Sequence, residues 1–192
     1  GVKRVVLPRV LSVPEIAAIN AETDVETEVF VFGGLCVMAE GRCSLSSYAT
    51  GLSPNMNGVC SPASHVEYQD DQGELSAKLG GYTIHRVGKD EPAPYPTLCK
   101  GCFSAGDQSG HLFEDPVSLN AEQLIPQLQK AGVTALKIEG RQRSKSYVAQ
   151  VVRNFRNAVD ALEAGQDLPA GMLAGLSEGQ ATTTGAYKKT WR

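Results

Sequence analysis

The chain has 192 residues, of which 42% are hydrophobic and 20% charged, and its formal net charge at pH 7 is -3. A chain of this length can bury a sizeable core as one domain. The slightly negative charge predicts neither a nucleic-acid partner nor an anionic membrane surface. No apolar run approaches the roughly 18 residues of a transmembrane segment, so we expect none.

The five cysteines are an odd number in a chain that is neither small nor rich in cysteine. This usage disfavours a secreted disulfide framework and favours reduced thiols or metal ligands in a cytosolic setting. The sequence also begins without a basic segment followed by an apolar one, the pattern typical of a secretory leader. We therefore expect a cytoplasmic protein.

The first elements predicted along the chain form a strand, a helix and a second strand. The apolar run at residues 2–7 predicts a buried parallel strand. Ser12 and Glu15 have the spacing of a capping box, which predicts a helix start. Residues 26–32 predict a strand that runs into Gly33. Together they span about 33 residues, the size of a βαβ unit.

The middle of the chain predicts an insertion at about residues 36–118. Residues 36–64 are expected to form a loop with a short helical turn near residues 44–48, because Gly, Ser, Asn and Pro interrupt any periodicity. Residues 65–98 predict short strands, with a hairpin turn at residues 70–73. Residues 101–118 are rich in glycine and polar residues.

The last part of the chain predicts a helix, a third strand and a longer helix. Pro126 predicts a kink or a late start for the first of these helices, and residues 133–138 predict a parallel strand. The next helix is expected to bury an apolar stripe whose members lie four or three residues apart, at Val148, Val152, Phe155, Val159 and Leu162. Residues 165–192 predict a tail that is loosely ordered until Tyr187 and Trp191.

Three parallel strands are too few to close a sheet, whereas an eight-stranded α/β barrel needs about 250 residues. The fold class predicted for residues 1–164 is therefore α/β, as the C-terminal part of a TIM-like (β/α) barrel. The cysteine-rich loop region and a short β insertion would interrupt it. The first strand would then expose a bare edge, which is an aggregation risk.

Four cysteines are candidate metal ligands: Cys36, Cys43, Cys60 and Cys99, separated by six, sixteen and thirty-eight residues. Thiolates are soft ligands that select iron–sulfur clusters, zinc or Cu(I). Structural zinc usually takes pairs two to four residues apart, a spacing found here only between Cys99 and Cys102. Wide spacing in loops suits a cluster, and buried thiols are common too. Spacing alone leaves cluster, zinc and core thiols comparable.

Charged residues at predicted strand ends are candidate substrate ligands. Glu139 and Arg141 follow the third strand, and Arg9 follows the first. The carboxyl ends of the last barrel strands commonly bind anions, and arginine suits bidentate recognition of a carboxylate. The alternative is a solvated basic turn. Peptidase chemistry finds little support, because the chain has only three histidines and lacks a His-Glu-x-x-His motif.

Several motifs resemble the family long labelled collagenase-like peptidases. They are Gly-Leu-Cys at residues 34–36, Glu-Gly-Arg-Cys-Ser-Leu-Ser-Ser-Tyr at 40–48, Asn-Gly-Val-Cys at 57–60 and Lys-Ile-Glu-Gly-Arg at 137–141. Residues 95–101, 139–144 and 182–187 are further similar to the branch that acts in ubiquinone biosynthesis when oxygen is absent. The resemblance covers essentially the whole chain.

The resemblance implies that Cys36, Cys43, Cys60 and Cys99 bind a [4Fe–4S] cluster. It also implies a heterodimer with a UbiV-like protein that hydroxylates a ubiquinone precursor without oxygen. The family includes RNA-hydroxylating members, for which prephenate is the implied oxygen donor, and we expect prephenate as the donor here. Many of those members read Cys-x-x-x-Cys-Arg at the third ligand, whereas Cys60 is followed by Ser-Pro-Ala-Ser-His.

This departure favours the quinone branch over RNA-base hydroxylation, which is the alternative. A second alternative is a non-catalytic scaffold subunit whose cluster orders the loop. Cys102 matches no ligand position of the family and is left out of the site.

Overall fold

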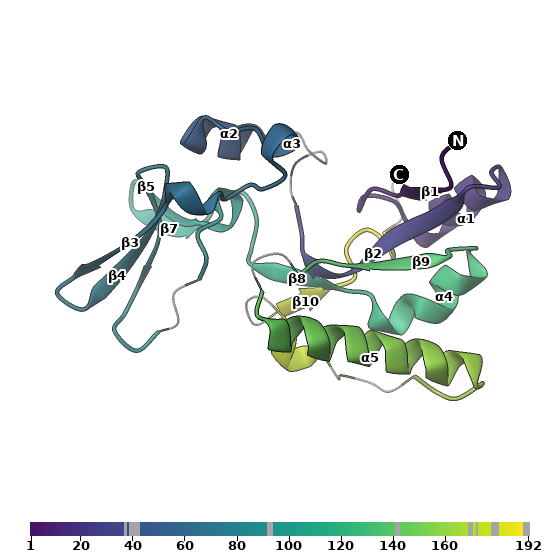
Figure 1. Cartoon of the computed structure of the whole chain (residues 1–192). Coiled ribbons are helices and arrows are strands. Elements are labelled where there is room, and N and C mark those ends of the chain that lie inside the picture. The colour runs from purple at the N-terminus through teal and green to yellow at the C-terminus, as the bar shows by residue number, and fades with distance from the viewer. Residues whose placement is uncertain are drawn as a thin grey trace. The chain divides into compact units, whose positions relative to one another are not determined.

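The computed structural model describes residues 1–36, 38, 43–91, 94–140, 143–168, 171, 173–177 and 181–189 (Figure 1). The chain divides into two compact units. The first, Gly1–Leu35 with Val117–Arg192, is called the α/β unit here. The second, Cys36–Pro116, is called the cysteine unit.

The sheet of the α/β unit is built around β2 (Glu26–Gly34). Strand β1 (Arg4–Val6) pairs with it in parallel on one side, and β9 (Ala135–Ile138) pairs in parallel on the other. The three parallel strands expected from the sequence are thus confirmed. The end of β2 also pairs antiparallel with β8 (Val117–Asn120), and β10 (Ala181–Thr183) lies parallel to β8. The sheet is therefore mixed.

The two shorter helices of this unit begin where the sequence predicts. Helix α1 (Val13–Ala21) starts with the capping box, in which the Glu15 carboxylate accepts hydrogen bonds from the Ser12 N–H and hydroxyl at 2.7 Å each. Helix α4 (Ile125–Lys130) follows the 3₁₀ turn η3 (Glu122–Leu124). Pro126 is the second residue of α4, where it removes no internal hydrogen bond, so the late start is confirmed.

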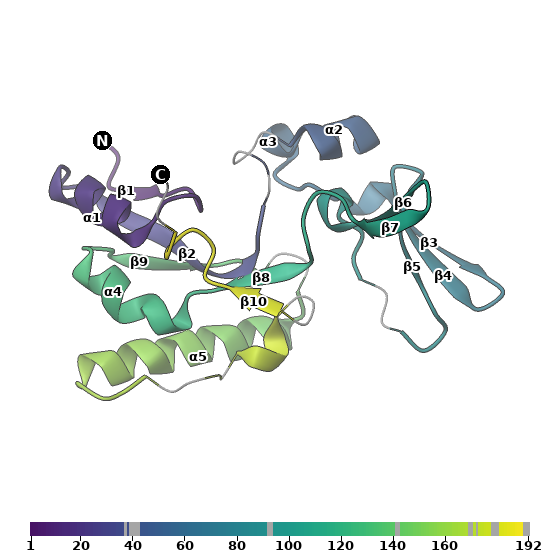
Figure 2. The ribbon, with the colours of Figure 1, turned by 180° about the vertical axis from the view of Figure 1, so that it is seen from behind.

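The long helix α5 (Lys145–Glu163) lies along one side of the sheet (Figures 1 and 2). Its fully buried side chains are Val151, Phe155 and Ala158. The expected stripe is therefore wrong at its first two members, since Val148 is 37% exposed and Val152 is 48% exposed. Two overlapping apolar stripes run along this helix, and the one that includes the small Ala158 is buried.

Phe32 of β2 lies at the centre of the core of the α/β unit. Its side chain is fully buried, and its ring lies 6.0 Å from that of Phe155 and 6.4 Å from that of Tyr147. Other buried apolar residues of this core come from β2, α1, η3, α4 and α5, and they include Val29, Val31, Ile16, Leu124, Leu128 and Val151. Burial of apolar side chains between the helices and the strands stabilises the sheet.

Two further expectations need correction. All three residues of β1 are exposed, rather than buried, because only β2 pairs with it among the described strands. The C-terminal segment is ordered earlier than expected, since β10 joins the sheet before the buried Tyr187. The described strands form an open sheet, and three parallel strands are too few to close one. A short 3₁₀ turn, η4 (Ala174–Leu176), precedes β10.

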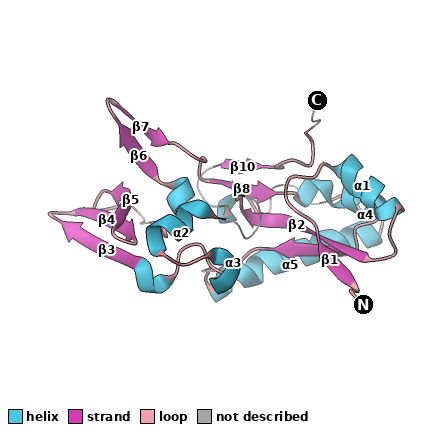
Figure 3. Cartoon of the chain, turned by 90° about the horizontal axis from the view of Figure 1, so that it is seen from above, coloured by secondary structure: helices cyan, strands magenta, loops and turns pink. Residues whose placement is uncertain are grey.

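The cysteine unit holds two small antiparallel sheets and short helices (Figure 3). The predicted hairpin turn is confirmed, and its Asp70 side chain accepts a hydrogen bond from the Gly73 N–H at 3.0 Å. The β6–β7 hairpin was not predicted. The elements are α2 (Ser44–Thr50), α3 (Pro54–Asn57), η1 (Ala63–His65), β3 (Val66–Asp71), β4 (Glu74–Leu79), β5 (Tyr82–Val87), η2 (Leu98–Lys100), β6 (Cys102–Ala105) and β7 (Gln108–His111).

Within the part of the chain that the structure describes, no helix combines the length and the apolar character needed to cross a bilayer.

Candidate functional site

All four candidate metal ligands lie in the cysteine unit. Cys36 follows β2, Cys43 caps α2, Cys60 lies between α3 and η1, and Cys99 is in η2. Each of them carries a thiol rather than a disulfide. The topology therefore gathers into one unit residues that are up to 63 positions apart in sequence.

The first turn of α2 connects two of these cysteines. The Cys43 sulfur accepts a hydrogen bond from the Ser46 N–H at 3.3 Å, as the N-cap of the helix. The Ser46 hydroxyl donates to the carbonyl oxygen of Cys60. N–H donors to a ligand sulfur orient the ligand and tune a bound metal group.

Cys99 is influenced by the other three thiols. The pKa of Cys99 is raised to about 12, mainly by burial; Lys100 opposes the rise, and the charges of Cys36, Cys60 and Cys43 add to it. Electrostatic influence of this kind falls off with distance. Cys36, Cys43 and Cys60 therefore lie near enough to Cys99 for their charges to affect its pKa.

The donor set fits an iron–sulfur cluster. Four cysteine thiolates are the usual ligands of a [4Fe–4S] centre, in which each sulfur binds a different iron atom. Among the residues described, no three or more His, Cys, Asp or Glu side chains are gathered as the ligands of a single metal ion. Cys102 opens β6, opposite His111 of β7.

A second candidate site lies in the α/β unit, where Arg9 and Glu139 form an ion pair. An Arg9 Nη2 atom lies 2.6 Å from the Glu139 Oε2 atom. The Arg9 guanidinium also stacks on the ring of Phe30, with its carbon 3.6 Å from the ring centroid. The Arg9 side chain is 11% exposed and that of Glu139 is 41% exposed. Arg141, the third expected ligand, lies outside the described residues.

Gly33 of β2 permits this arrangement. Its φ is +125°, and a Cβ atom at this position would lie 2.7 Å from the Cβ of Glu139. The Glu139 N–H donates to the carbonyl oxygen of Phe32 at 2.9 Å. Only glycine allows the chain after β9 to approach β2 so closely.

Tyr187 lies near enough to Arg9 for their charges to interact, and sequence reasoning did not assign it to this site. Its side chain is 5% exposed, and its hydroxyl donates to the carbonyl oxygen of Phe30. Burial raises the pKa of Tyr187 to about 12, and the charge of Arg9 opposes this rise. The signals in the sequence were the resemblance of residues 182–187 to the family and an aromatic residue in a segment otherwise rich in Gly, Ser and Thr.

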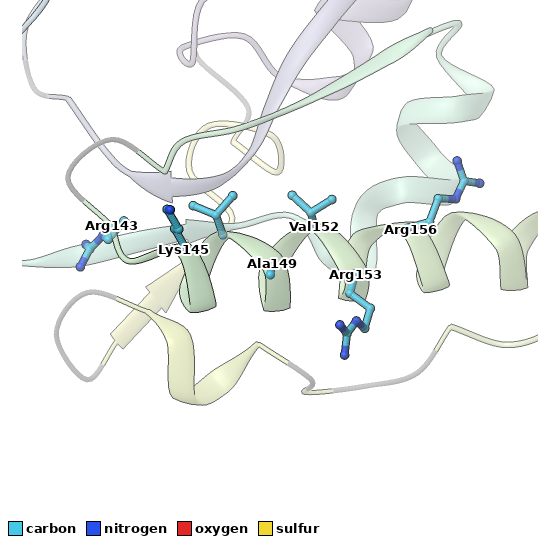
Figure 4. Close-up of a pocket in the computed structure, with 7 residues that line it drawn as sticks. Arg143, Lys145, Ala149, Val152, Arg153 and Arg156 are labelled. Atoms are coloured by element: carbon cyan, nitrogen blue, oxygen red, sulfur yellow. The ribbon is translucent and has the colours of Figure 1, made fainter.

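An open hollow of about 570 Å³ runs along the outer side of α5 (Figure 4). Arg156 is already paired there, since an Nη2 atom lies 2.5 Å from the Asp160 carboxylate. The hollow combines cationic and aliphatic side chains, namely Arg143, Lys145, Val148, Ala149, Val152, Arg153 and Arg156.

Comparison with known proteins places the chain in a family. Residues 1–184 match the family described as Peptidase family U32. The chain is 35% identical to the tRNA hydroxylation protein P of Escherichia coli, over 92% of the chain and 43% of that protein. It is 33% identical to the protein of the same name from Haemophilus influenzae, over 90% of the chain and 42% of that protein.

It is also 32% identical to the 23S rRNA 5-hydroxycytidine C2501 synthase of Escherichia coli, over 84% of the chain and 20% of that protein. No solved structure matches the chain. The chain spans less than half the length of these relatives. The match over nearly its whole length shows that the chain belongs to the peptidase U32 family, the collagenase-like peptidases.

Proposed function

We propose that the chain is part of an oxygen-independent hydroxylase component that carries a [4Fe–4S] cluster. The observation that carries the proposal is the gathering of Cys36, Cys43, Cys60 and Cys99 in one unit. The relatives named for RNA hydroxylation support a hydroxylase role. When bound, the cluster would supply electron transfer or activation of an oxygen donor.

The substrate proposed is a ubiquinone precursor, with the chain acting as the C-terminal part of a UbiU-like subunit paired with a UbiV-like protein. The motif after Cys60 supports this branch. So does the charge of the cysteine unit, which has ten Asp and Glu residues against five Lys and Arg. An excess of acidic residues disfavours contact with phosphates.

Arg9 and Glu139 are proposed as substrate ligands in the α/β unit, with Arg141 as a third. Phe30 and Glu139 hold the Arg9 guanidinium in place, so its charge is oriented before a ligand arrives. A guanidinium recognises carboxylates through paired hydrogen bonds, which suits a dianionic oxygen donor such as prephenate.

The whole protein is proposed to be a TIM-like barrel. Parallel sheets are usually covered on both faces, yet β1 is exposed here and lies at an edge of the described sheet. Further strands of a longer protein would cover that edge, which agrees with the greater length of the relatives.

Metal analysis tests the cluster directly. After anaerobic purification we expect close to four iron and four sulfide per chain, and replacement of Cys36, Cys43, Cys60 or Cys99 by serine lowers both. Cys102→Ser is the matched control and retains the cluster. Colourless protein with stoichiometric zinc would overturn the cluster.

RNA-base hydroxylation is the second candidate, and the names of the relatives favour it. Deletion of the gene separates the two substrates. Loss of ubiquinone during anaerobic growth, with hydroxylated nucleosides unchanged, supports the quinone reading. Loss of a hydroxylated nucleoside, with ubiquinone unchanged, supports the RNA reading.

Glu139→Gln separates an enzyme from a scaffold. A catalytic component retains its cluster and its partner in this variant but loses hydroxylation. A scaffold subunit hydroxylates normally once the pair has assembled.

A further inference from the structure

Two exposed tyrosines lie side by side on the cysteine unit. The side chain of Tyr48, on α2, is 78% exposed, and that of Tyr82, on β5, is 47% exposed. Their ring centroids are 5.9 Å apart, with an angle of 39° between the ring planes. We call this pair the tyrosine platform. Such exposure of paired aromatic rings leaves apolar area in water that a bound surface would cover.

The backbone around the tyrosine platform is built to hold the two rings together. Gly80, in the turn between β4 and β5, has a φ of +57°, and a Cβ atom there would lie 1.8 Å from the carbonyl oxygen of Ala49. The turn therefore packs directly on the backbone of α2, next to Tyr48. Gly81 follows with a φ of +83° and open space around its Cα, and Tyr82 comes next.

The tyrosine platform is joined to two of the candidate cluster ligands through α2. Cys43 caps this helix, and Ser46 binds the carbonyl oxygen of Cys60. Tyr48 lies on the same seven-residue helix as Ser46. A molecule that covers the tyrosine platform would therefore bind beside the cysteine-bearing loops.

We propose that the tyrosine platform is the docking point for the protein partner of the hydroxylase, a proposal that rests on the function proposed above. Tyrosine is enriched in protein interfaces, and buried tyrosines near the centre of an interface commonly contribute most of the binding energy. Two tyrosines cover only part of a standard interface of about 800 Å² per partner, so they would be its anchor.

Charge selects the kind of partner. A surface that stacks nucleic-acid bases on aromatic rings also needs cations for the phosphates, but the cysteine unit has twice as many acidic as basic residues. The cations of the neighbouring sheet are engaged, since Lys78 donates to Gln69 at 2.6 Å and Arg86 lies 2.9 Å from Glu74. The partner surface that fits is an apolar recess rimmed by Lys and Arg.

Co-purification of the full-length protein with the UbiV-like protein tests this proposal. The double variant Tyr48→Ser/Tyr82→Ser is expected to weaken pairing at least tenfold, with iron and sulfide content and circular dichroism unchanged. Tyr48→Phe/Tyr82→Phe keeps the rings and is expected to pair within about threefold of the wild type. Added salt is expected to weaken wild-type pairing, because the proposal sets the acidic cysteine unit against Lys and Arg of the partner.

The exposed valines of α5 provide a matched control. Val148→Ser/Val152→Ser removes a similar apolar surface from the α/β unit and is expected to leave pairing unchanged. Wild-type affinity in the double tyrosine variant would overturn the proposal. So would ultraviolet crosslinking of these tyrosines to RNA.

The test distinguishes failure of the platform from failure of the proposed function. If the wild type carries its cluster and pairs, and the tyrosine variants pair equally well, only the platform is wrong. If the wild type carries no cluster and pairs with no UbiV-like protein, both proposals are wrong.

Discussion

Arg9 is held in place by two different interactions, and each depends on a neighbouring residue. The Phe30 ring supports the flat face of the guanidinium, and the Glu139 carboxylate binds its edge. Lysine could keep the charge but not the stacking. An arginine therefore suits this position in the segment after β1 better than a lysine.

Gly33→Ala tests the close approach of β2 to Glu139. We expect the free energy of unfolding to fall by at least about 2 kcal/mol, because the new Cβ meets that of Glu139 and the φ is positive. Urea unfolding measures the loss. Gly165→Ala is the control in the same unit, since its φ is +67° with open space around it, and should cost only about 1 kcal/mol. Equal losses would contradict the contact.

Tyr187→Phe tests the buried hydroxyl. Its pKa is about 12 in the folded chain and about 10 when unfolded, so the folded state binds this proton more tightly. The associated stability, about 2–3 kcal/mol, is fully present below pH 10 and is lost as pH rises through 12.

Phenylalanine cannot ionise, so this variant should be less sensitive to alkali than the wild type, and less stable by about 1 kcal/mol at pH 7 for the lost hydrogen bond. Thermal melts between pH 7 and pH 12 measure both effects. If the variant and the wild type lost the same stability as pH rises, another group would be responsible for the alkaline loss.

Sequence reasoning reached part of this site. Arg9 and Glu139 could be selected because parallel strands place their carboxyl ends at one edge of a sheet. Tyr187 could not be selected for this site, because its position depends on a hydrogen bond to Phe30 of β2, 157 positions away in the sequence. Local patterns carry no information about such a contact.

At the scale of elements, the sequence predicts helix starts well, because the interactions that set them act within one turn of the chain. The Ser12 and Glu15 capping box and the late start of α4 follow from such chemistry. Strands β8 and β10 were missed because they are short and rich in Ser, Thr and Asn, and their pairing is set by the tertiary fold.

The buried face of α5 gives a prediction at this scale. Val151→Ala should lower the free energy of unfolding by about 2 kcal/mol, because its side chain is fully buried. Val152→Ala removes the same atoms from a side chain that is 48% exposed, and should cost less than about 0.5 kcal/mol. Chemical denaturation of both variants measures the two losses. A larger loss for Val152→Ala than for Val151→Ala would show that the stripe expected from periodicity faces the core.

At the scale of the molecule, the three parallel strands could be predicted because each one follows the pattern of an apolar run. The mixed sheet could not, since it requires β8 and β10 to return from distant parts of the chain. Each unit has its own buried residues, with Ala77, Leu79 and Ile84 in the cysteine unit. The chain passes between the units only at residues 35–36 and 116–117.

This division predicts how a cluster should affect unfolding. The four cysteines lie in the cysteine unit alone, and a group that binds only folded protein stabilises the part that holds it. Calorimetry of the protein with its cluster should show two transitions, and chelation of the iron should lower one of them by at least about 5 °C. Val151→Ala should lower the temperature of the other transition only, and this would assign that transition to the α/β unit. A single transition that moves as a whole in both experiments would instead mean that the two units unfold as one.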